Sequence, residues 1–437
     1  MIKAHILALS LLLCISASAH ADTSGLFPLP DLPAGWSSQD LKPLEKIIGE
    51  SRFVGLGESA HTGEDFSQAK FQIIRYLVES LGFRALAFET GTGWRFSTKT
   101  SKYVETCEGS SSEALRGLSD VWRGQSIAEL LTWLCQFNKN HPNDPVKFFS
   151  FDLQGQDFED LNAINVDLPK ALPEDASQLY SGLSKCVGYG LTKDSYQQEI
   201  TKIYRGEKTI SATDHQDCIH GLDRLDRAIE SQIKNSRHTG ILRMLRISSV
   251  GVRASQNVLY TLNPGFRDEG MATLFDYFRE IEAPNSKVVL WAHNIHLSQR
   301  GSSIKSTACI PPQTPVWANS KTMGEFLTKK HGKQYAPVAL TAYDLSILNY
   351  GEPQPWPAIR IPPPQTPGSV ESGFASVEAN LHSQQAKNWL LDLKGSFLET
   401  SRIYTLEDIG CKDPMIPAEQ YRAIISLEKV APMRSPK

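Results

Sequence analysis

The chain has 437 residues, of which 41% are hydrophobic and 21% are charged, and its formal net charge at pH 7 is −3. These proportions are ordinary for a globular protein, and the length exceeds what one compact core usually holds, so we expect a main domain with a sizeable insertion. The balanced charge gives no reason to expect a nucleic-acid partner or a surface attracted to anionic membranes.

The first 21 residues differ from the rest of the chain. A lysine precedes an apolar run over 6–15, and the small-x-small sequence AHA ends at Ala21. This pattern predicts a secretory signal peptide at 1–21 with cleavage after Ala21, and hence an exported protein that is periplasmic or secreted. The run is too short to span a membrane, and no later stretch approaches the length that a span requires.

Six cysteines remain once the signal peptide is removed. An even number in an exported chain predicts disulfides, although some of these side chains could instead be free and buried. No CxxC motif is present, so neither a thiol redox site nor a zinc ribbon is indicated. The pairing that we prefer closes each loop within one region of the chain: Cys107–Cys135, Cys186–Cys218 and Cys309–Cys411.

Two kinds of hydrophobic periodicity alternate over 22–160. Apolar runs typical of buried strands alternate with segments of helical spacing. A strand, a helix and a second strand in quick succession form a βαβ unit, which implies parallel strands. We therefore expect an α/β fold with a mainly parallel central sheet flanked by helices. The expected strands are 53–56, 84–88 and 146–151, and the expected helices are 41–49, 65–82 and 127–137.

The alternation stops after residue 160. From 161 to 284 the periodicity is helical, most clearly at 210–229 and 241–262, which predicts a helical insertion or side domain. Two proline clusters within 351–368 predict a surface loop there. The second part of the α/β core is expected at 285–437, with strands at 287–292, 338–340, 389–393 and 423–427.

Four of the expected strands end in residues that can carry chemistry. Because the carboxyl ends of parallel strands meet at one edge of a sheet, we expect these side chains to share one cleft. Each of them alone has a structural explanation, such as a helix cap, an ion pair with an arginine or a buried histidine, but together they favour a functional site. They are Glu58 and His61, Glu89, Asp152 and Gln154, and His293 and His296.

The residues allow more than one chemistry. No G-x-S-x-G nucleophile elbow, HExxH pair or Walker-type phosphate loop is present. Three histidines and two glutamates suffice for a metal-dependent hydrolase. The same five residues suit metal-free hydrolysis, in which an imidazole oriented by a carboxylate activates water. A non-catalytic protein that binds a small molecule is a third alternative.

Several stretches of the chain resemble signature blocks of the erythromycin esterase family. The resemblance implies an α/β core with helices on both faces, a helical side domain, and hydrolysis of a small-molecule ester such as a macrolide lactone, and thereby antibiotic resistance. It also implies that the reaction needs no metal or other cofactor. The blocks are VGLGESAHTGEDF, IIRYLVESLGFRALAFET and KVVLWAHNIHL, supported by FFSFDLQGQD, RDEGMATLF and TMGEFLTKKHGKQY.

The resemblance also implies roles for individual residues. Lys70 stands where family members often carry an arginine, and Arg267 opens the RDxxMA block, so both are expected to hold a substrate oxygen. The catalytic positions carried over are the motif glutamate Glu58, the water-activating base His61, Glu89 at the end of the second strand, and the paired histidines His293 and His296.

One part of the first block departs from the family pattern. The family commonly has threonine before the motif histidine and glycine directly after it, whereas this chain has Ala60 and Thr62, with glycine deferred to Gly63. The loop around the histidine is therefore expected to differ from that of other members.

Overall fold

The computed structural model describes residues 25–436 apart from 92–93, 154–156, 234–238, 305–319, 351–352, 362, 364–374, 385, 395, 397, 399–401 and 409–410. The expected signal peptide at 1–21, Gln154 and Cys309 lie outside the described residues. Among the residues that are described, no helix is both long and apolar enough to cross a membrane.

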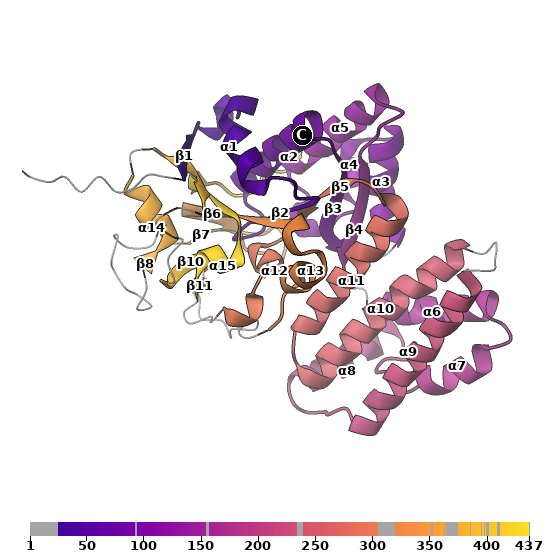
Figure 1. Ribbon diagram of the computed structural model, residues 1–437. Coiled ribbons are helices and arrows are strands. Elements are labelled where there is room, and N and C mark those ends of the chain that lie inside the picture. The colour runs from indigo at the N-terminus through magenta and orange to yellow at the C-terminus, as the bar shows by residue number, and fades with distance from the viewer. Residues whose placement is uncertain are drawn as a thin grey trace, which may run out of the picture.

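A mixed sheet forms the centre of the described structure (Figure 1). Within the described residues it has nine strands in the order β1-β9-β12-β6-β2-β5-β3-β4, with β7 paired to β6. The run from β12 to β4 is parallel throughout, whereas β1, β9 and β7 pair antiparallel with their neighbours. The strands are β1 Leu26–Leu29, β2 Phe53–Leu56, β3 Phe83–Gly91, β4 Lys147–Asp152, β5 Lys287–Trp291, β6 Tyr335–Leu348, β7 Ala358–Ile361, β9 Asn388–Asp392 and β12 Ala423–Val430.

The predicted α/β fold with a mainly parallel sheet is confirmed. Each of the seven predicted strands corresponds to a strand of this sheet, because buried parallel strands form nearly continuous apolar runs. The prediction of a loop at 351–368 is wrong at β7, where the sequence AIRI between the two proline clusters pairs with the end of β6. A second sheet was not predicted; it has the order β11-β10-β8 and consists of β8 Ala375–Ser376, β10 Tyr404–Asp408 and β11 Cys411–Met415.

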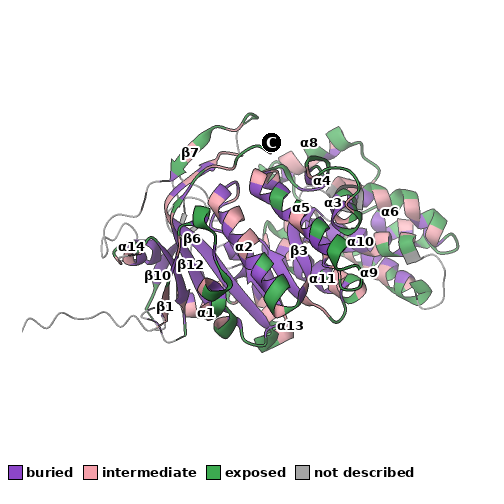
Figure 2. Cartoon of the chain, turned by 90° about the horizontal axis from the view of Figure 1, so that it is seen from above, coloured by how far each residue is buried: buried purple, intermediate pink, exposed green. Residues whose placement is uncertain are grey.

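Helices cover both faces of the central sheet, and alternate strand residues point to opposite faces. Val54 and Leu56 of β2 pack into the core on one face, whereas Phe53 packs into the core on the other. Figure 2 shows the buried sheet between helices whose outer sides are exposed. The first core is covered by α1 Ser38–Ile48, α2 Glu64–Leu81, α3 Trp94–Thr106, α4 Ser111–Leu115 and α5 Gln125–Asn140, and the second by α11 Gly265–Glu282 and α13 Met323–His331.

A group of helices between β4 and α11 has a hydrophobic core of its own. In Figure 1 these helices lie together to one side of the sheet. Helix α11 differs from them because it packs against the sheet core through Met271 and Phe275. The domain boundaries at 161 and 284 stay a prediction. The helices of this group are α6 Asp157–Ala171, α7 Ala176–Leu183, α8 Lys193–Tyr204, α9 Ala212–Ile233 and α10 Thr239–Thr261.

Two of the three preferred disulfides are present. Cys107–Cys135 joins the end of α3 to α5 with a Cα–Cα distance of 5.3 Å, and Cys186–Cys218 joins the segment after α7 to α9 at 4.9 Å. These separations are usual for disulfides. The third predicted pair falls on Cys309, outside the described residues, and the side chain of its partner Cys411 is also outside them.

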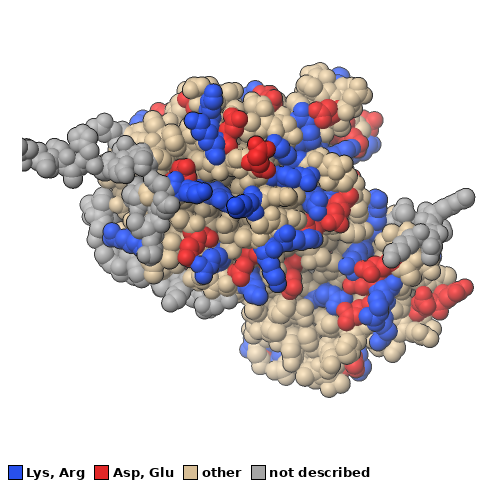
Figure 3. All heavy atoms as spheres, in the orientation of Figure 1, with Lys and Arg blue, Asp and Glu red and all other residues tan. Residues whose placement is uncertain are grey.

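The molecular surface in Figure 3 carries both signs of charge. On this face, lysine and arginine side chains alternate with aspartate and glutamate side chains over the sheet region and the helical group. A mixed distribution of this kind suits a globular protein with a formal net charge near zero.

Candidate active site

The structure brings the predicted residues together at the carboxyl edge of four adjacent strands. Strands β2, β5, β3 and β4 are neighbours in that order, and all four are parallel. Chain segments at the ends of these strands carry the ionisable groups. Glu58 follows β2, Glu89 lies near the end of β3, Asp152 ends β4, and His293 and His296 follow β5.

A glycine and an asparagine fix the close approach of the β2 and β5 ends. A Cβ atom on Gly57 would lie 2.0 Å from Oδ1 of Asn294, so only glycine fits there. The Asn294 amide donates to the Leu340 carbonyl at 2.8 Å and accepts from the Leu340 backbone N–H at 3.2 Å. Its own backbone N–H donates to the Glu58 carbonyl at 2.9 Å. These bonds hold the loops after β2 and β5 side by side.

Glu58 orients His61 and is itself held by a buried lysine. Nδ1 of His61 lies 3.1 Å from one Glu58 carboxylate oxygen. The Lys70 ammonium group, from α2, donates to the other Glu58 oxygen and to the Ala292 carbonyl, and it lies 4.4 Å from the centre of the Trp291 ring. Burial lowers the pKa of Lys70 to about 8, although the Glu58 carboxylate opposes this shift.

Aromatic rings surround His61. The Trp122 ring meets it edge-on with 4.6 Å between ring centres, and the His293 ring lies at 5.1 Å. Trp122 is fixed because its indole N–H donates to the Glu89 carbonyl at 2.7 Å. The His61 ring is therefore confined between a rigid aromatic wall and a second imidazole.

Glu89 is the central acceptor of the site. One carboxylate oxygen accepts the His293 backbone N–H at 2.7 Å, and the other lies 3.3 Å from Nε2 of His296 and 3.4 Å from Nη2 of Arg267. Burial on its own would raise the pKa of Glu89. The neighbouring charges of His296, His61 and Arg267 outweigh burial, however, and hold the pKa of this carboxyl well below its ordinary value.

His296 is paired with two carboxylates. Its Nδ1 lies 2.8 and 3.0 Å from the two oxygens of Asp268, and its Nε2 faces Glu89. Burial opposes the charged form, but these two carboxylates raise the pKa of His296 to about 10. The ring is therefore an imidazolium at neutral pH.

Asp268 was not among the predicted site residues. It is completely buried in the first turn of α11, and it also accepts the backbone N–H of Met323 at 2.7 Å, which ties α13 to the site. The available signal was the acidic residue beside Arg267 in the RDxxMA block. Nothing in the helical pattern distinguished it from an ordinary acidic residue near a helix N-terminus.

Arg267 forms a two-pronged ion pair with Asp152. Its Nε and Nη2 each donate to one Asp152 oxygen at 2.9 Å, which is the geometry that fixes a guanidinium plane. Nη1 lies 3.3 Å from Nε2 of His296, and the Asp152, Glu89 and Asp268 carboxylates outweigh burial to raise the pKa of Arg267 above its ordinary value. The explanation of Asp152 as an arginine partner is thus the one that the structure supports.

His293 differs from His296 although both rings are buried. Burial and the nearby His61 lower its pKa to about 3, against the opposing charge of Glu89. Its Nδ1 accepts the backbone N–H of Ile295 at 3.5 Å, as the cap of the short helix α12 Asn294–Leu297. A neutral His293 that accepts at Nδ1 carries its proton on Nε2.

The two residues expected to hold a substrate oxygen are placed differently. The side chain of Arg267 is 18% exposed, so a substrate could touch it. The side chain of Lys70 is 0% exposed and lies behind Glu58. Lys70 is therefore placed to act through Glu58, and Arg267 alone of the two is placed for direct contact.

The described residues offer no ready metal centre. Among them, no group of three histidine, cysteine, aspartate or glutamate side chains is arranged so that it could hold a metal ion. The protonation of His296 is a separate obstacle, because a ligating imidazole must be neutral. His296, by contrast, is held as an imidazolium between Asp268 and Glu89.

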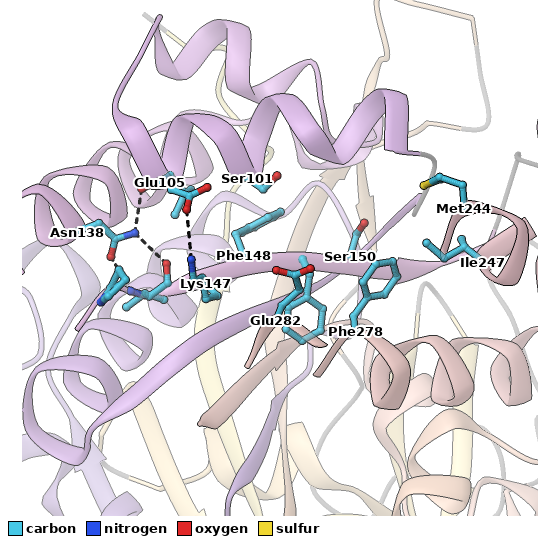
Figure 4. A pocket seen from close by; sticks show the side chains of 14 residues that line it. Ser101, Glu105, Asn138, Lys147, Phe148, Ser150, Met244, Ile247, Phe278 and Glu282 are labelled. Atoms are coloured by element: carbon cyan, nitrogen blue, oxygen red, sulfur yellow. Dashed lines mark hydrogen bonds and ion pairs between the residues drawn. The ribbon is translucent and has the colours of Figure 1, made fainter. Parts of the chain in front are cut away.

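A separate cavity of about 240 Å³ lies at the outer edge of β4 (Figure 4). Residues of α3, α5, β4, α10 and α11 line it, with Phe148 and Phe278 on its walls and Glu105 paired to Lys147 at 3.3 Å. None of the predicted site residues lines this cavity, so it is distinct from the cluster at the carboxyl edge.

Fold and site together define an α/β protein with a buried imidazole, carboxylate and guanidinium cluster at the carboxyl edge of its parallel strands, where such folds place their chemistry. The family described as erythromycin esterase has a model that matches residues 78–430. The chain therefore belongs to the erythromycin esterase family and is a hydrolase of that family.

Similar proteins span most of the chain. YbfO of Bacillus subtilis (strain 168), which is named as a hydrolase, is 23% identical over 91% of this chain and 87% of its own length. Erythromycin esterase type I of Escherichia coli is 24% identical over 71% of this chain and 75% of its own length. At these identities the relationship is distant.

Solved structures share the fold. A mutant of the erythromycin esterase EreC in its open conformation is 18% identical, with a TM-score of 0.66 over 93% of this chain and 98% of that chain. A crystal structure described as a succinoglycan biosynthesis protein is 19% identical, with a TM-score of 0.67 over 94% of this chain and 96% of that chain.

The family match does not cover the whole site. Glu89, Arg267, His293 and His296 lie inside the matched range, which begins at residue 78. Glu58, His61 and Lys70 precede that range, so their roles depend on the geometry described above and on the resemblance of the first sequence block.

Proposed function

We propose that the protein is an exported esterase that hydrolyses an ester or lactone with water activated by His61, without a metal ion. The observation that carries this proposal is the pair formed by His61 and Glu58. Since Nδ1 of the ring is held 3.1 Å from a carboxylate, a neutral ring keeps its proton on Nδ1 and leaves Nε2 as the basic nitrogen. The His61 side chain is 14% exposed, so water can reach it.

The proposed reaction has two steps. Nε2 of His61 takes a proton from water while the water oxygen bonds to the carbonyl carbon, which forms a tetrahedral oxyanion and an imidazolium. The bond from that carbon to the ester oxygen then breaks, and the imidazolium returns the proton to the departing alcohol. The products are a carboxylic acid and an alcohol, and His61 is neutral again.

The charge balance of the site supports this assignment. The site as a whole contains four carboxylates against three cations, so one negative charge is left over. An imidazolium formed on His61 would balance this charge, and its Nδ1–H would face the Glu58 carboxylate at 3.1 Å. The carboxylates are Glu58, Glu89, Asp152 and Asp268, and the cations are Lys70, Arg267 and His296.

Two further residues of the site would stabilise the oxyanion. The exposed part of Arg267 would supply positive charge. His293, whose ring centre lies 5.1 Å from that of His61, is only 2% exposed, so a substrate must displace the groups that cover its Nε2 before this nitrogen can donate. Donors fixed in advance at the position of developing charge often make the largest contribution to acyl transfer.

The main alternative is a metal-dependent hydrolase that uses the same histidines. The contacts of His296 argue against it, because Nδ1 is taken up by Asp268 and Nε2 lies between Glu89 and the Arg267 guanidinium. A second alternative is a protein that binds a small ligand at the same place without converting it.

A panel of chromogenic esters and macrolides tests the proposal. We expect turnover of at least one ester, unchanged by a strong chelator, and a kcat that falls about 10²–10⁴-fold in His61→Ala. His220→Ala, which removes an exposed histidine of α9, is the matched control and should keep full activity.

Other outcomes select the alternatives. Chelator-sensitive turnover together with stoichiometric bound zinc would establish the metal-dependent mechanism. Ligand binding without turnover of any panel member would indicate a binding protein. Full activity in His61→Ala would remove this residue from the mechanism.

The proposed export is supported by the disulfides Cys107–Cys135 and Cys186–Cys218, because disulfides persist in oxidising compartments. Intact-mass analysis after expression with the natural leader should give a chain that begins at Asp22. A mass that retains residues 1–21 would contradict export.

A further inference from the structure

The end of the chain lies against the loop that carries His61. Gly63 forms an antiparallel bridge with Pro432, and the backbone N–H of Glu64 donates to the Ala431 carbonyl at 2.9 Å. In Figure 1 the C-terminus lies beside α2 and α5. We call residues 431–434 the C-terminal clamp.

Thr62, directly after His61, has a conformation that threonine rarely adopts. Its φ angle is +61°, in the left-handed region, where a β-branched side chain is an outlier. Glycine, by contrast, adopts positive φ at no steric cost. This chain must therefore hold Thr62 in place by other contacts.

Three hydrogen bonds hold Thr62. Its hydroxyl donates to the Leu348 carbonyl at 3.0 Å and accepts the Leu348 backbone N–H at 3.0 Å, so the end of β6 fixes the side chain. Its carbonyl accepts the backbone N–H of Met433 at 2.7 Å, so the C-terminal clamp fixes the main chain. Strained conformations persist only where the surroundings determine them in this way.

The C-terminal clamp is also anchored to the start of both neighbouring helices. The buried Glu64 carboxylate, in the first turn of α2, accepts from the Arg434 backbone N–H at 2.9 Å, the Arg434 guanidinium at 3.0 Å and the Ser126 hydroxyl at 2.6 Å. The Arg434 carbonyl accepts the backbone N–H of Gln125, at the start of α5, at 2.9 Å.

The C-terminal clamp also contacts the segment that carries Trp122, whose ring lies beside His61. Met433 packs so closely on Gly124 that a Cβ atom there would lie 2.5 Å from the methionine Cγ. Gly124 follows Trp122 by two residues, and the Trp122 ring contacts His61. The clamp therefore contacts both the residue after His61 and the segment that carries Trp122.

We propose that the C-terminal clamp is a positioning element of the active site, which holds Thr62 in its left-handed conformation and so fixes the direction of the His61 ring. The inference rests on the proposed function in that His61 is taken as the base. It assigns to 431–434 a role in catalysis, exerted through Thr62, that is separate from any contribution to folding.

A pair of substitutions at one position tests this role. Met433→Pro removes the backbone N–H that Thr62 accepts, whereas Met433→Ala keeps it and removes only the side chain. We expect Met433→Pro to lower kcat about 10²-fold with KM nearly unchanged, since small misplacements of a catalytic group have effects of this size. Met433→Ala loses the packing on Gly124 but keeps the backbone bond to Thr62, so its kcat should fall much less than that of Met433→Pro.

Rescue by glycine distinguishes positioning from a general loss of structure. Thr62→Gly combined with Met433→Pro should recover part of the lost kcat, because glycine adopts the required φ without the clamp. A merely structural defect would not be repaired by introducing glycine. Truncation after Val430 should behave like Met433→Pro, and truncation after Arg434 should leave activity unchanged.

A readout other than turnover separates this inference from the proposed function. In protein with ¹⁵N-labelled histidine, the His61 nitrogen shifts report the ring's tautomer and its contact with Glu58. We expect them to change in Met433→Pro and to return towards the parent values with Thr62→Gly, whether or not any ester is hydrolysed. Parent-like His61 shifts in both Met433→Pro and the Val430 truncation would overturn the role of the clamp.

Discussion

The proposed active site has two groups of residues whose pKa values shift in opposite directions. On one side, burial lowers the pKa of Lys70 to about 8 and that of His293 to about 3, so these groups are neutral or lose their proton near the working pH range. On the other, carboxylates raise the pKa of His296 to about 10 despite its burial. The proton-exchange side consists of Glu58, His61, Lys70 and His293, and the fixed-charge side of Asp152, Arg267, Asp268 and His296.

The comparison shows that burial does not decide the state of a histidine in this site. His293 and His296 follow the same strand and are equally inaccessible, yet their pKa values move in opposite directions. The difference lies in their partners, since His293 accepts a backbone N–H whereas His296 faces two carboxylates. The first side thus holds the proposed base His61 and the neutral donor His293, while the second keeps the positive charges of Arg267 and His296.

After His61→Ala, the largest effect is expected for Asp268→Asn, which removes one of the two carboxylates that hold His296 as an imidazolium. Breaking a buried ion pair by removing one partner typically costs about 3–5 kcal/mol of stability. We also expect kcat to fall at least as much as on loss of one oxyanion donor, about 10²–10³-fold. Urea unfolding and ester turnover measure the two effects.

The pH dependence of stability sharpens this prediction. Because folding raises the pKa of His296 from 6.5 to about 10, its stabilising contribution is complete below pH 6.5 and is lost as the pH rises towards 10. In Asp268→Asn this loss should be much smaller. The control is Asp276→Asn. Asp276 lies on α11, as Asp268 does, and pairs with His331 of α13, so this variant should lower stability without lowering kcat.

A smaller effect is expected for His293→Ala. Loss of one neutral donor should lower kcat about 10²-fold, and the acid limb of the pH–rate profile should remain, because a His293 with a pKa of about 3 does not titrate there. Profiles of kcat against pH from 5 to 9 for His293→Ala and His61→Ala test whether the acid limb belongs to His61. If His293→Ala removed the acid limb and His61→Ala retained it, the two histidines would have exchanged roles.

The sheet could be predicted where its strands are buried on both faces. β2, β3 and β5 are nearly continuous apolar runs, and their carboxyl-end residues follow directly in the sequence. β7 carries exposed residues and an arginine, β8 has only two residues, and the four residues of β1 include a proline and are only partly buried, so none of them has the pattern of a buried strand. Their pairing is decided by the neighbouring strand, as for β7 against β6.

The site could be predicted in so far as its residues end strands. Asp268 was missed because it lies on a helix, where its burial against His296 and Met323 comes only from tertiary packing. The departure at Thr62 was visible in the sequence, whereas its support by Met433 was not. The hydrogen bond from Met433 to Thr62 joins segments far apart in the sequence, so no local sequence pattern predicts it.

The smallest effect is expected for Lys70→Arg, which tests whether the proton-exchange side depends on a cation that titrates. With a pKa of about 8, Lys70 loses its charge as the pH rises to 9, and the loss of one positive charge beside Glu58 disfavours an anionic transition state. An arginine stays charged over this range, so the alkaline limb of the pH–rate profile should move to higher pH. The kcat at pH 7 should stay within about tenfold of that of the parent protein. Lys70→Met is the matched control; it should be slow at every pH and lack the limb, because Glu58 then has no cation to lose. An alkaline limb at the same pH in Lys70→Arg and in the parent protein would show that another group controls it.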